Sequence, residues 1–367
     1  MNRREFLAGA LALMGGSPPD GPRLERRAPP GRPAAPIVKA AYLTYYGVGD
    51  MAIREQVFGL LEHTELNGIV IDAKGDRGLI PYETRLPLAE AAGAMGPVRI
   101  RDFDDMLAGL RRRGLHTIAR VVVFKDDVLA RHRPEWAVID TRTGKPWLDR
   151  EGLAWLDPFK EAAWEHPIAV AREAALKGFD EIQFDYLRFP TDGPLAAARY
   201  SRPSTQETRL ATVSEFLRRA RRALDGTGAA LAVDVFGYTA FNTDDTAIGQ
   251  RIEELTPLVD YLCPMAYPSS YHAGIPGYPN PVAHPYEVVS ETVQRLRQRV
   301  GAAPVGIRPW LQDFRDYAFD RRPFGPAEVR AEISAAEDTG AAGWMLWNPR
   351  NQYTAAALRP KPRPASG

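Results

Sequence analysis

Short apolar runs rich in β-branched residues alternate with amphipathic stretches along most of the chain. Such alternation is typical of a parallel sheet in which each strand is followed by a helix. Gly114, Gly178 and Gly340 fall where three helices are expected to end, just before the next strand. The expected strands are Val38–Tyr46, Gly68–Lys74, His116–Phe124, Phe179–Phe189, Ala230–Gly237, Val259–Tyr267, Pro304–Leu311 and Gly343–Asn348. The expected helices are Arg54–Glu65, Phe103–Arg113, Glu161–Lys177, Glu207–Leu224, Ala247–Leu255, Tyr286–Val300 and Ala327–Thr339.

Eight strand–helix units predict an α/β fold of the TIM (β/α)8 barrel type rather than an open sheet. No G-x-G-x-x-G motif follows the first strand, so a dinucleotide-binding fold is not indicated. The connections at 75–101 and 125–159 exceed the roughly 15 residues of an ordinary loop. Both follow the carboxyl ends of strands, where barrel enzymes build their sites, so we interpret them as cleft walls. The second contains Trp136, Trp147 and Trp155.

The ends of the chain differ from its centre. Residues 1–16 contain the pattern Asn2–Leu7 of a twin-arginine signal, followed by an apolar run too short to span a bilayer. Residues 17–36 and 359–367 are rich in proline and predict a linker and a tail around a barrel at 37–358. We therefore expect export by the twin-arginine machinery to the periplasm or beyond, with no stable membrane span.

Composition excludes several classes of function. The formal net charge is +1 and the basic residues are spread along the chain, which argues against a nucleic-acid partner. Cys263 is the only cysteine, so neither a disulfide framework nor a cysteine-based zinc site is expected. The six histidines form no H-x-H pair, and a G-x-S-x-G elbow is absent. We expect no metal and no organic cofactor.

Alternation along the strands predicts which side chains point into the barrel. If Ile182 and Phe184 pack outward, Gln183 and Asp185 point inward, with Asp185 at the top of its strand. The same argument places two carboxylates and three cations or rings on the inner parity of other strands. These are Asp72, Lys74, Asp234, Arg308 and Trp310.

Buried charges are costly unless they are paired or wet, so inward carboxylates favour a solvated catalytic mouth. Glycoside hydrolysis needs one protonated carboxyl group and one ionised carboxylate. We interpret Asp185, Asp234 and Asp72 as candidate catalytic residues. Alternatives remain open, because Asp234 could hold a neighbour by hydrogen bonds and Asp72 could pair with Lys74. Arg308 could equally orient a carboxylate or contact the substrate.

Aromatic residues gather at or just past the expected strand ends, where flat rings can cover the apolar faces of sugars. Ordinary packing between barrel and helices explains some of them. These residues are Tyr45, Tyr46, Phe124, Tyr186, Tyr238, Tyr267, Tyr271, Trp310 and Trp347.

The stretch Gly178–Pro190, with the sequence GFDEIQFDYLRFP, resembles a motif of a bacterial family of glycoside-hydrolase-like TIM barrels. Ile69–Lys74, Ala119–Phe124, Pro134–Ala137, Arg308–Phe314 and Gly343–Asn348 are similar to that family in the same order. The resemblance implies a hydrolase-like site. Arg120, Arg188 and Gln312 lie in or beside the matching stretches and are further candidates for substrate binding. The inward cations Lys74, Arg120 and Arg308 suggest an acidic or amino-sugar-free substrate, but they could equally pair with Asp72 and Asp185.

Cys263–Pro268 and Trp344 more distantly resemble chitinase-type barrels. That resemblance implies that Met265 and Tyr267 contact the reacting sugar and that Trp344 floors the pocket. The glutamate that ends the chitinase motif on the fourth strand is missing here, since Leu187 stands in its place. The departure argues against substrate-assisted hydrolysis and leaves Asp185 as the principal residue of that strand.

The sequence thus predicts a glycosidase that hydrolyses a bacterial extracellular or cell-wall polysaccharide. A barrel that binds glycans without cleaving them is the alternative. The expected substrate-binding residues are Tyr45, Lys74, Arg120, Gln183, Arg188, Tyr238, Met265, Tyr267, Arg308, Trp310, Gln312, Trp344 and Trp347.

Overall fold

Eight parallel strands close into a barrel, as the alternating pattern predicts. The computed structural model describes residues 36–97 and 100–361, so the expected signal segment and nearly all of the linker lie outside it. The sheet order is β10-β11-β1-β2-β3-β5-β7-β8-β9, and a pairing of Trp310 with Met265 between β10 and β8 closes the ring. The barrel strands are β1 (Val38–Leu43), β2 (Gly68–Lys74), β3 (His116–Val122), β5 (Glu181–Asp185), β7 (Ala230–Phe236), β8 (Tyr261–Met265), β9 (Gly306–Ile307) with β10 (Trp310–Gln312), and β11 (Gly343–Trp347).

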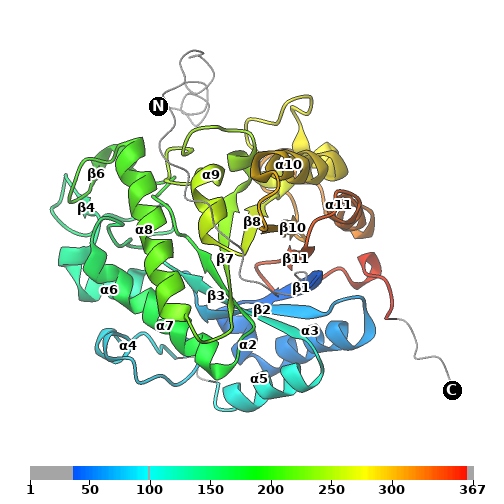
Figure 1. Ribbon diagram of the computed structural model, residues 1–367, viewed down its shortest axis with the longest axis horizontal. Coiled ribbons are helices and arrows are strands. Elements are labelled where there is room, and N and C mark those ends of the chain that lie inside the picture. The colour runs from blue at the N-terminus through cyan, green and yellow to red at the C-terminus, as the bar shows by residue number, and fades with distance from the viewer. Residues whose placement is uncertain (1–35, 98–99, 362–367) are drawn as a thin grey trace.

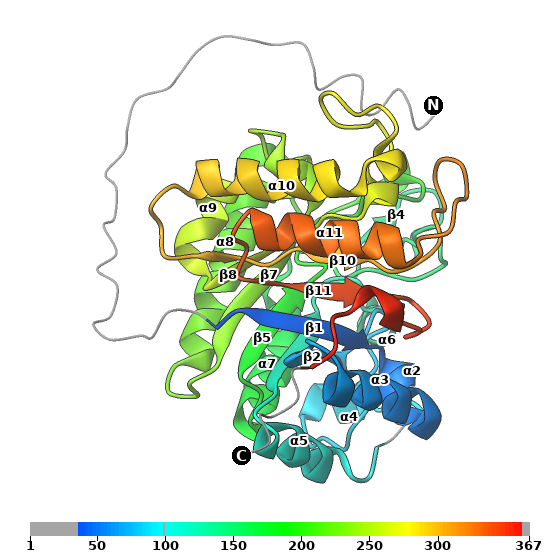
Figure 2. The same cartoon turned by 90° about the vertical axis from the view of Figure 1, so that its right-hand side faces the viewer.

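Helices surround the barrel (Figure 1), and because neighbouring strands are parallel, their carboxyl ends lie on one side of it. Figure 2 shows β1 and β11 running toward the same side, where α6 and β4 also lie. The helices are α2 (Tyr45–Gly49), α3 (Met51–His63), α4 (Pro87–Ala92), α5 (Phe103–Arg112), α6 (Asp127–His132), α7 (Glu165–Lys177), α8 (Gln206–Leu224), α9 (Ile252–Leu255), α10 (Pro285–Val300) and α11 (Pro326–Asp338).

Several expected elements are shorter than the sequence pattern suggested. The first strand ends at Leu43 because the Thr44 side chain accepts a hydrogen bond from the Gly47 N–H and starts α2. The strand expected at 304–311 is divided into β9 and β10 around Pro309. The helix expected at 247–255 is reduced to the single turn α9. The Thr44 cap and Pro309 thus interrupt two stretches that the apolar pattern predicted to be continuous strands.

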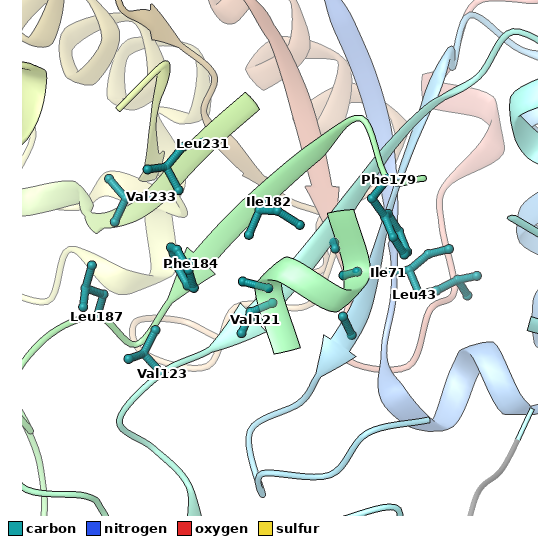
Figure 3. Packing of buried hydrophobic residues seen from close by; sticks show 14 of the residues in the cluster. Leu43, Ile71, Val121, Val123, Phe179, Ile182, Phe184, Leu187, Leu231 and Val233 are labelled. Atoms are coloured by element: carbon teal, nitrogen blue, oxygen red, sulfur yellow. The ribbon is translucent and has the colours of Figure 1, made fainter. Parts of the chain in front are cut away.

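The apolar side chains form two layers, as the parity argument requires. Ile71, Ile182, Phe184 and Val233 belong to the outer layer, between the strands and the helices. Figure 3 shows Ile182, Phe184 and Val233 packed together in this layer. The inner layer fills the barrel itself with Val70, Ile118, Ala232, Trp310, Met345 and their neighbours. The predicted inward direction of residues such as Trp310 is therefore confirmed.

The long connection after β3 is an ordered wall. It contains α6 and the two-residue strand β4 (Ile139–Asp140), which pairs with β6 (Ala198–Arg199) from the connection after β5. Trp147 and Trp155 are buried in this wall, and their indole N–H groups donate to the Pro194 carbonyl and the Asp149 carboxylate.

The last described residues pair with the end of α3. Arg359 and Lys361 exchange backbone hydrogen bonds with Glu65 and His63, and Thr64 forms a bridge with Pro360. Regular pairing thus continues three residues beyond the expected barrel boundary at 358.

Candidate active site

Arg120 joins three carboxylates at the carboxyl ends of the first strands. It points inward from β3, and its Nη1 donates to Asp72 Oδ1 at 2.7 Å. Its Nη2 donates to Asp76 Oδ1 at 2.8 Å and to Asp185 Oδ2 at 2.7 Å, and its Nε donates to Asp185 Oδ2 at 2.9 Å. Because all three carboxylates share one guanidinium group, Arg120 fixes their relative positions. The structure therefore brings Asp72, Arg120 and Asp185 together.

Asp185 ends β5 and is 7% exposed. In addition to Arg120, the backbone N–H of Tyr186 donates to its Oδ1 at 2.6 Å. Tyr186 itself has a φ of 51°, a left-handed conformation that is uncommon for a bulky residue. Such strain persists only where the surroundings impose it, and it concentrates at functional sites. Here it turns the chain sharply and aims a donor back at the carboxylate.

Asp234 on β7 lies beside Asp185. Phe184 pairs with Val233, so continuing the register places Asp185 opposite Asp234 on the adjacent strand. The indole N–H of Trp310 donates to Asp234 Oδ1 at 2.7 Å, while Oδ2 is buried without a hydrogen-bond partner among the described residues. Burial, and next the negative charge of Asp185, raise the pKa of Asp234 well above its ordinary value. Two neighbouring carboxyl groups thus occupy unlike environments.

Asp72 is buried and fully committed to hydrogen bonds within the protein. Its Oδ2 accepts from the Tyr42 hydroxyl at 2.8 Å and from the Tyr45 N–H at 2.9 Å. Burial raises the pKa of Asp72, although Arg120 acts in the opposite direction. Pairing with Lys74, the open alternative, does not occur. Asp72 is thus placed to hold Arg120 and the start of α2.

Two residues of this network did not emerge from the sequence. Asp76 follows β2 in an irregular loop, and its side chain is 43% exposed, so it is the most accessible carboxylate of the group. Partial desolvation raises the pKa of Asp76, but the Arg120 guanidinium outweighs it and lowers that pKa below its ordinary value. Tyr42 stands on the inner parity of β1, and that parity could have identified it. For Asp76 no periodic signal exists, because loop residues do not alternate.

A half-buried aromatic group forms the other side of the mouth. The rings of Tyr267 and Trp347 lie 5.4 Å apart, and Phe314 stands 5.6 Å from Tyr267 and 4.9 Å from Trp347. Met265 is half-buried beside the same cluster. The structure places Met265, Tyr267 and Trp347 at the mouth, where they can line a sugar-binding surface.

Lys74 and Trp344 point away from the mouth, contrary to expectation. A bulge between Asp72 and Lys74 reverses the alternation, because Lys74 pairs with the outward residue Val121. Its ammonium group is buried against Asp126, 2.7 Å away. Trp344 belongs to the outer layer, since its neighbour Met345 is the inward residue of β11. Trp347, three residues later, lies at the mouth, where the chitinase resemblance predicted Trp344.

Arg308 and Gln312 make hydrogen bonds within the barrel and its loops. Arg308 Nη1 lies 2.8 Å from both oxygens of Glu181, at the opposite end of β5 from Asp185, so it orients a carboxylate and is remote from the mouth. Gln312 is buried, and its amide bonds the Ser269 backbone N–H, the Ser269 hydroxyl and the Phe314 carbonyl. It ties β10 to the loop after β8.

The other candidates hold loops or fill the barrel. Gln183 is buried one layer beneath Asp185, with its amide against the Met345 sulfur. Tyr45 is buried in α2 and supplies its backbone N–H to Asp72. The Tyr238 hydroxyl donates to the Gly274 carbonyl and accepts from the Ala273 N–H. The positions of these side chains do not support their prediction as substrate-binding residues.

Within residues 36–97 and 100–361, no group of three or more His, Cys, Asp or Glu side chains is arranged to hold a metal ion. No helix of the same described part is long and apolar enough to cross a membrane.

The raised pKa of Asp234 predicts how stability depends on pH. A folded-state pKa above the unfolded value of about 3.9 means that the native protein binds the extra proton, so stability falls as pH rises from that value through the raised pKa. We expect Asp234→Asn, which cannot ionise and keeps an oxygen for Trp310, to be at least as stable as the native protein at pH 8. Urea unfolding at pH 5 and pH 8 measures this. A variant that lost stability equally at both values would contradict the assignment.

Comparison with known proteins identifies the family. Residues 40–353 match the family model described as "Putative glycosyl hydrolase domain". The chain belongs to this family. Because the match spans almost the whole barrel, the family assignment covers every candidate site residue described above. The glycosyl-hydrolase character of the domain is thus shown at the level of the family, without a specific activity. No curated protein matches the chain.

The first two solved structures named here share the fold, and the third is similar in sequence over part of the chain. The PgaB (BpsB) glycoside hydrolase domain from Bordetella bronchiseptica is 16% identical with a TM-score of 0.60, covering 86% of this chain and 95% of that one. A chitinase from Chromobacterium violaceum is 16% identical with a TM-score of 0.50, covering 87% and 98%. A hypothetical protein from Ruminiclostridium thermocellum is 35% identical over 53% of this chain and 97% of that one, with a TM-score of 0.45.

Proposed function

We propose that the protein is a glycoside hydrolase that cleaves a bacterial extracellular or cell-wall polysaccharide at the carboxyl face of its barrel. Asp234 donates a proton to the glycosidic oxygen as the bond from that oxygen to the anomeric carbon breaks. Asp185, as a carboxylate, attacks the anomeric carbon or takes a proton from the attacking water. Both roles need only these two side chains and water.

The observation that carries this proposal is the unlike environment of two adjacent aspartates. The pKa of Asp234 is raised because this side chain is desolvated and faces Asp185, whereas N–H donors from Arg120 and Tyr186 surround Asp185. Neighbouring carboxyl groups whose proton affinities differ are the usual basis for dividing acid and base roles. Adjacent parallel strands lie about 4.8 Å apart. That spacing favours the carboxyl separation of roughly 5–5.5 Å seen in retaining enzymes.

The aromatic group supports a sugar substrate. Tyr267 and Trp347 are half-buried, and their rings lie 5.4 Å apart at an interplanar angle of 33°. The expected twin-arginine segment supports a substrate outside the cytoplasm, and we include export in the proposal.

A glycan-binding barrel without catalysis is the second candidate. The observation that favours it is the burial of Asp234, which is only 1% exposed. If Asp234 never meets a substrate, its role is to brace Trp310 and Asp185, and the mouth then only binds. Turnover separates the two, because binding alone releases no new reducing ends.

The proposal is tested with a panel of bacterial exopolysaccharides and peptidoglycan glycans. Native protein should release reducing ends from at least one of them, and the double variant Asp185→Asn/Asp234→Asn should release none above buffer. Sedimentation of insoluble glycans with both proteins reports binding in parallel. Binding by native protein without release from any glycan would support the second candidate and reject hydrolysis.

A further inference from the structure

The buried positive side chains of the barrel and of its mouth have unequal surroundings. Arg120, Lys74 and Arg308 each lie within 3 Å of at least one carboxylate oxygen, so each is paired with a carboxylate of the protein. Arg188 is different. It forms no ion pair with any carboxylate of residues 36–97 and 100–361, although it is only 7% exposed.

Aromatic rings hold Arg188 close to the two aspartates. Its guanidinium carbon lies 4.8 Å from the ring centre of Tyr186, 4.6 Å from that of Phe236 and 5.2 Å from that of Trp155. Tyr186 directly follows Asp185, and Phe236 stands two residues after Asp234. The cation is therefore stacked on the residues that follow both candidate catalytic groups.

The hydrogen bonds of Arg188 leave one edge of the guanidinium group unused. Nη1 donates to the Phe189 carbonyl at 3.1 Å and to the Thr191 hydroxyl at 3.3 Å. Nε is buried without a partner, and Nη2 has no hydrogen bond to the described residues. Nε and Nη2 form the side edge with which arginine binds a carboxylate through two parallel hydrogen bonds. Arg120 uses the same edge toward Asp185.

The nearby acids act on Arg188 through their charge but form no hydrogen bond with it: burial lowers the pKa of Arg188, while Asp185, Asp192 and Asp149 oppose that shift. Asp149 accepts from the Trp155 indole and from the backbone N–H groups of Glu151 and Leu153, and Asp192 accepts from the Arg150 N–H. A buried cation is costly unless something compensates it, and stacking on rings does so only in part. The unpartnered Nε and Nη2 of Arg188 are suited to a ligand that brings its own carboxylate.

We propose that Arg188 binds the carboxylate of a uronic acid residue in the substrate, next to the cleavage site. The inference rests on the proposed function and narrows its substrate to acidic polysaccharides. Nε and Nη2 donate to the two carboxylate oxygens, and the Tyr186 and Phe236 rings keep the guanidinium plane fixed. A neutral sugar at this subsite would leave the cation unpaired.

Calorimetry with sodium D-galacturonate and with D-galactose tests the subsite without requiring turnover. Native protein should bind galacturonate, and Arg188→Gln should weaken that binding at least about tenfold, the usual effect of losing a charge-assisted hydrogen bond. Arg188→Lys keeps the charge but lacks the planar fork, so it should bind with intermediate affinity. The matched control is Arg133→Gln, which removes a half-exposed arginine that also stacks on an aromatic ring, 4.3 Å from the ring centre of Trp136. It should bind as native.

Thermal unfolding confirms that each variant is folded before it is compared. If galacturonate fails to bind, binds no better than galactose, or binds Arg188→Gln as tightly as native protein, the subsite is rejected. A polymer that native protein cleaves gives a second arm, in which its carboxyl-reduced form should be cleaved at least about tenfold less efficiently. Absence of reducing ends from every polymer would reject the hydrolase and leave the calorimetric result to decide the subsite.

Discussion

Asp185→Asn is expected to lower the rate of reducing-end release by about 10³-fold, because asparagine can neither attack the anomeric carbon nor accept a proton from water. The substitution keeps the size of the side chain and one oxygen for the Tyr186 N–H. Glycan binding should therefore persist, and the loss should appear in kcat more than in KM. Initial rates on the best polymer of the panel measure the effect.

The matched control for this experiment is Asp180→Asn, near the other end of the same strand. Asp180 accepts from the Thr117 N–H and hydroxyl at the amino end of the barrel, remote from the mouth. It should retain native turnover within about twofold, as expected of a residue outside the site. Equal losses in both variants would show that Asp185 acts through stability, and the catalytic assignment would then be wrong.

Arg120→Gln is expected to destabilise the protein by about 3–5 kcal/mol near neutral pH, because it leaves buried carboxylates without their cation. Arg120 is nearly buried and bonds Asp72, Asp76 and Asp185 together. Arg120 lowers the pKa of Asp76, so Asp76 stabilises the folded protein at pH values above its unfolded pKa of about 3.9. That contribution is lost as pH falls through the lower pKa that Asp76 has in the folded protein. The penalty of the variant should therefore shrink in acid. Urea unfolding at pH 7 and at pH 3, below the unfolded value, measures both effects.

Arg218→Gln is the control for a surface ion pair. Arg218 lies 3.5 Å from Glu215 on α8, with its side chain 49% exposed, so its removal should cost less than about 1 kcal/mol. A similar small loss in Arg120→Gln would mean that the three carboxylates do not depend on Arg120.

The regular part of the molecule could be predicted from its hydrophobic pattern. Strands buried on one face by helices alternate strictly, so Ile182 and Phe184 sufficed to place Gln183 and Asp185 inside the barrel. The same parity placed Asp72, Asp234 and Trp310 correctly, and their mutual contacts followed once the barrel closed.

What escaped prediction depends on backbone irregularity. A bulge after Asp72 turns Lys74 outward, and nothing in the run IVIDAK marks where alternation breaks. The parity of β11 depends on which residue starts the strand, so Trp344 and Trp347 could not be told apart by resemblance alone. Asp76 lies in a loop, where contacts are set by the tertiary fold and leave no periodic trace.

The pairing of Arg359–Lys361 with the end of α3 has a consequence for the closure of the barrel. A chain that forms a ring has one covalent gap, and here it lies between β11 and β1. Glu65 bridges it with ion pairs to Arg330 and Lys39 and a hydrogen bond from the Arg359 N–H, which lower the pKa of Glu65 to about 2 against the opposing effect of burial. Residues 359–361 and Glu65 thus connect the first and last units of the ring, which separate only after these hydrogen bonds and ion pairs are broken.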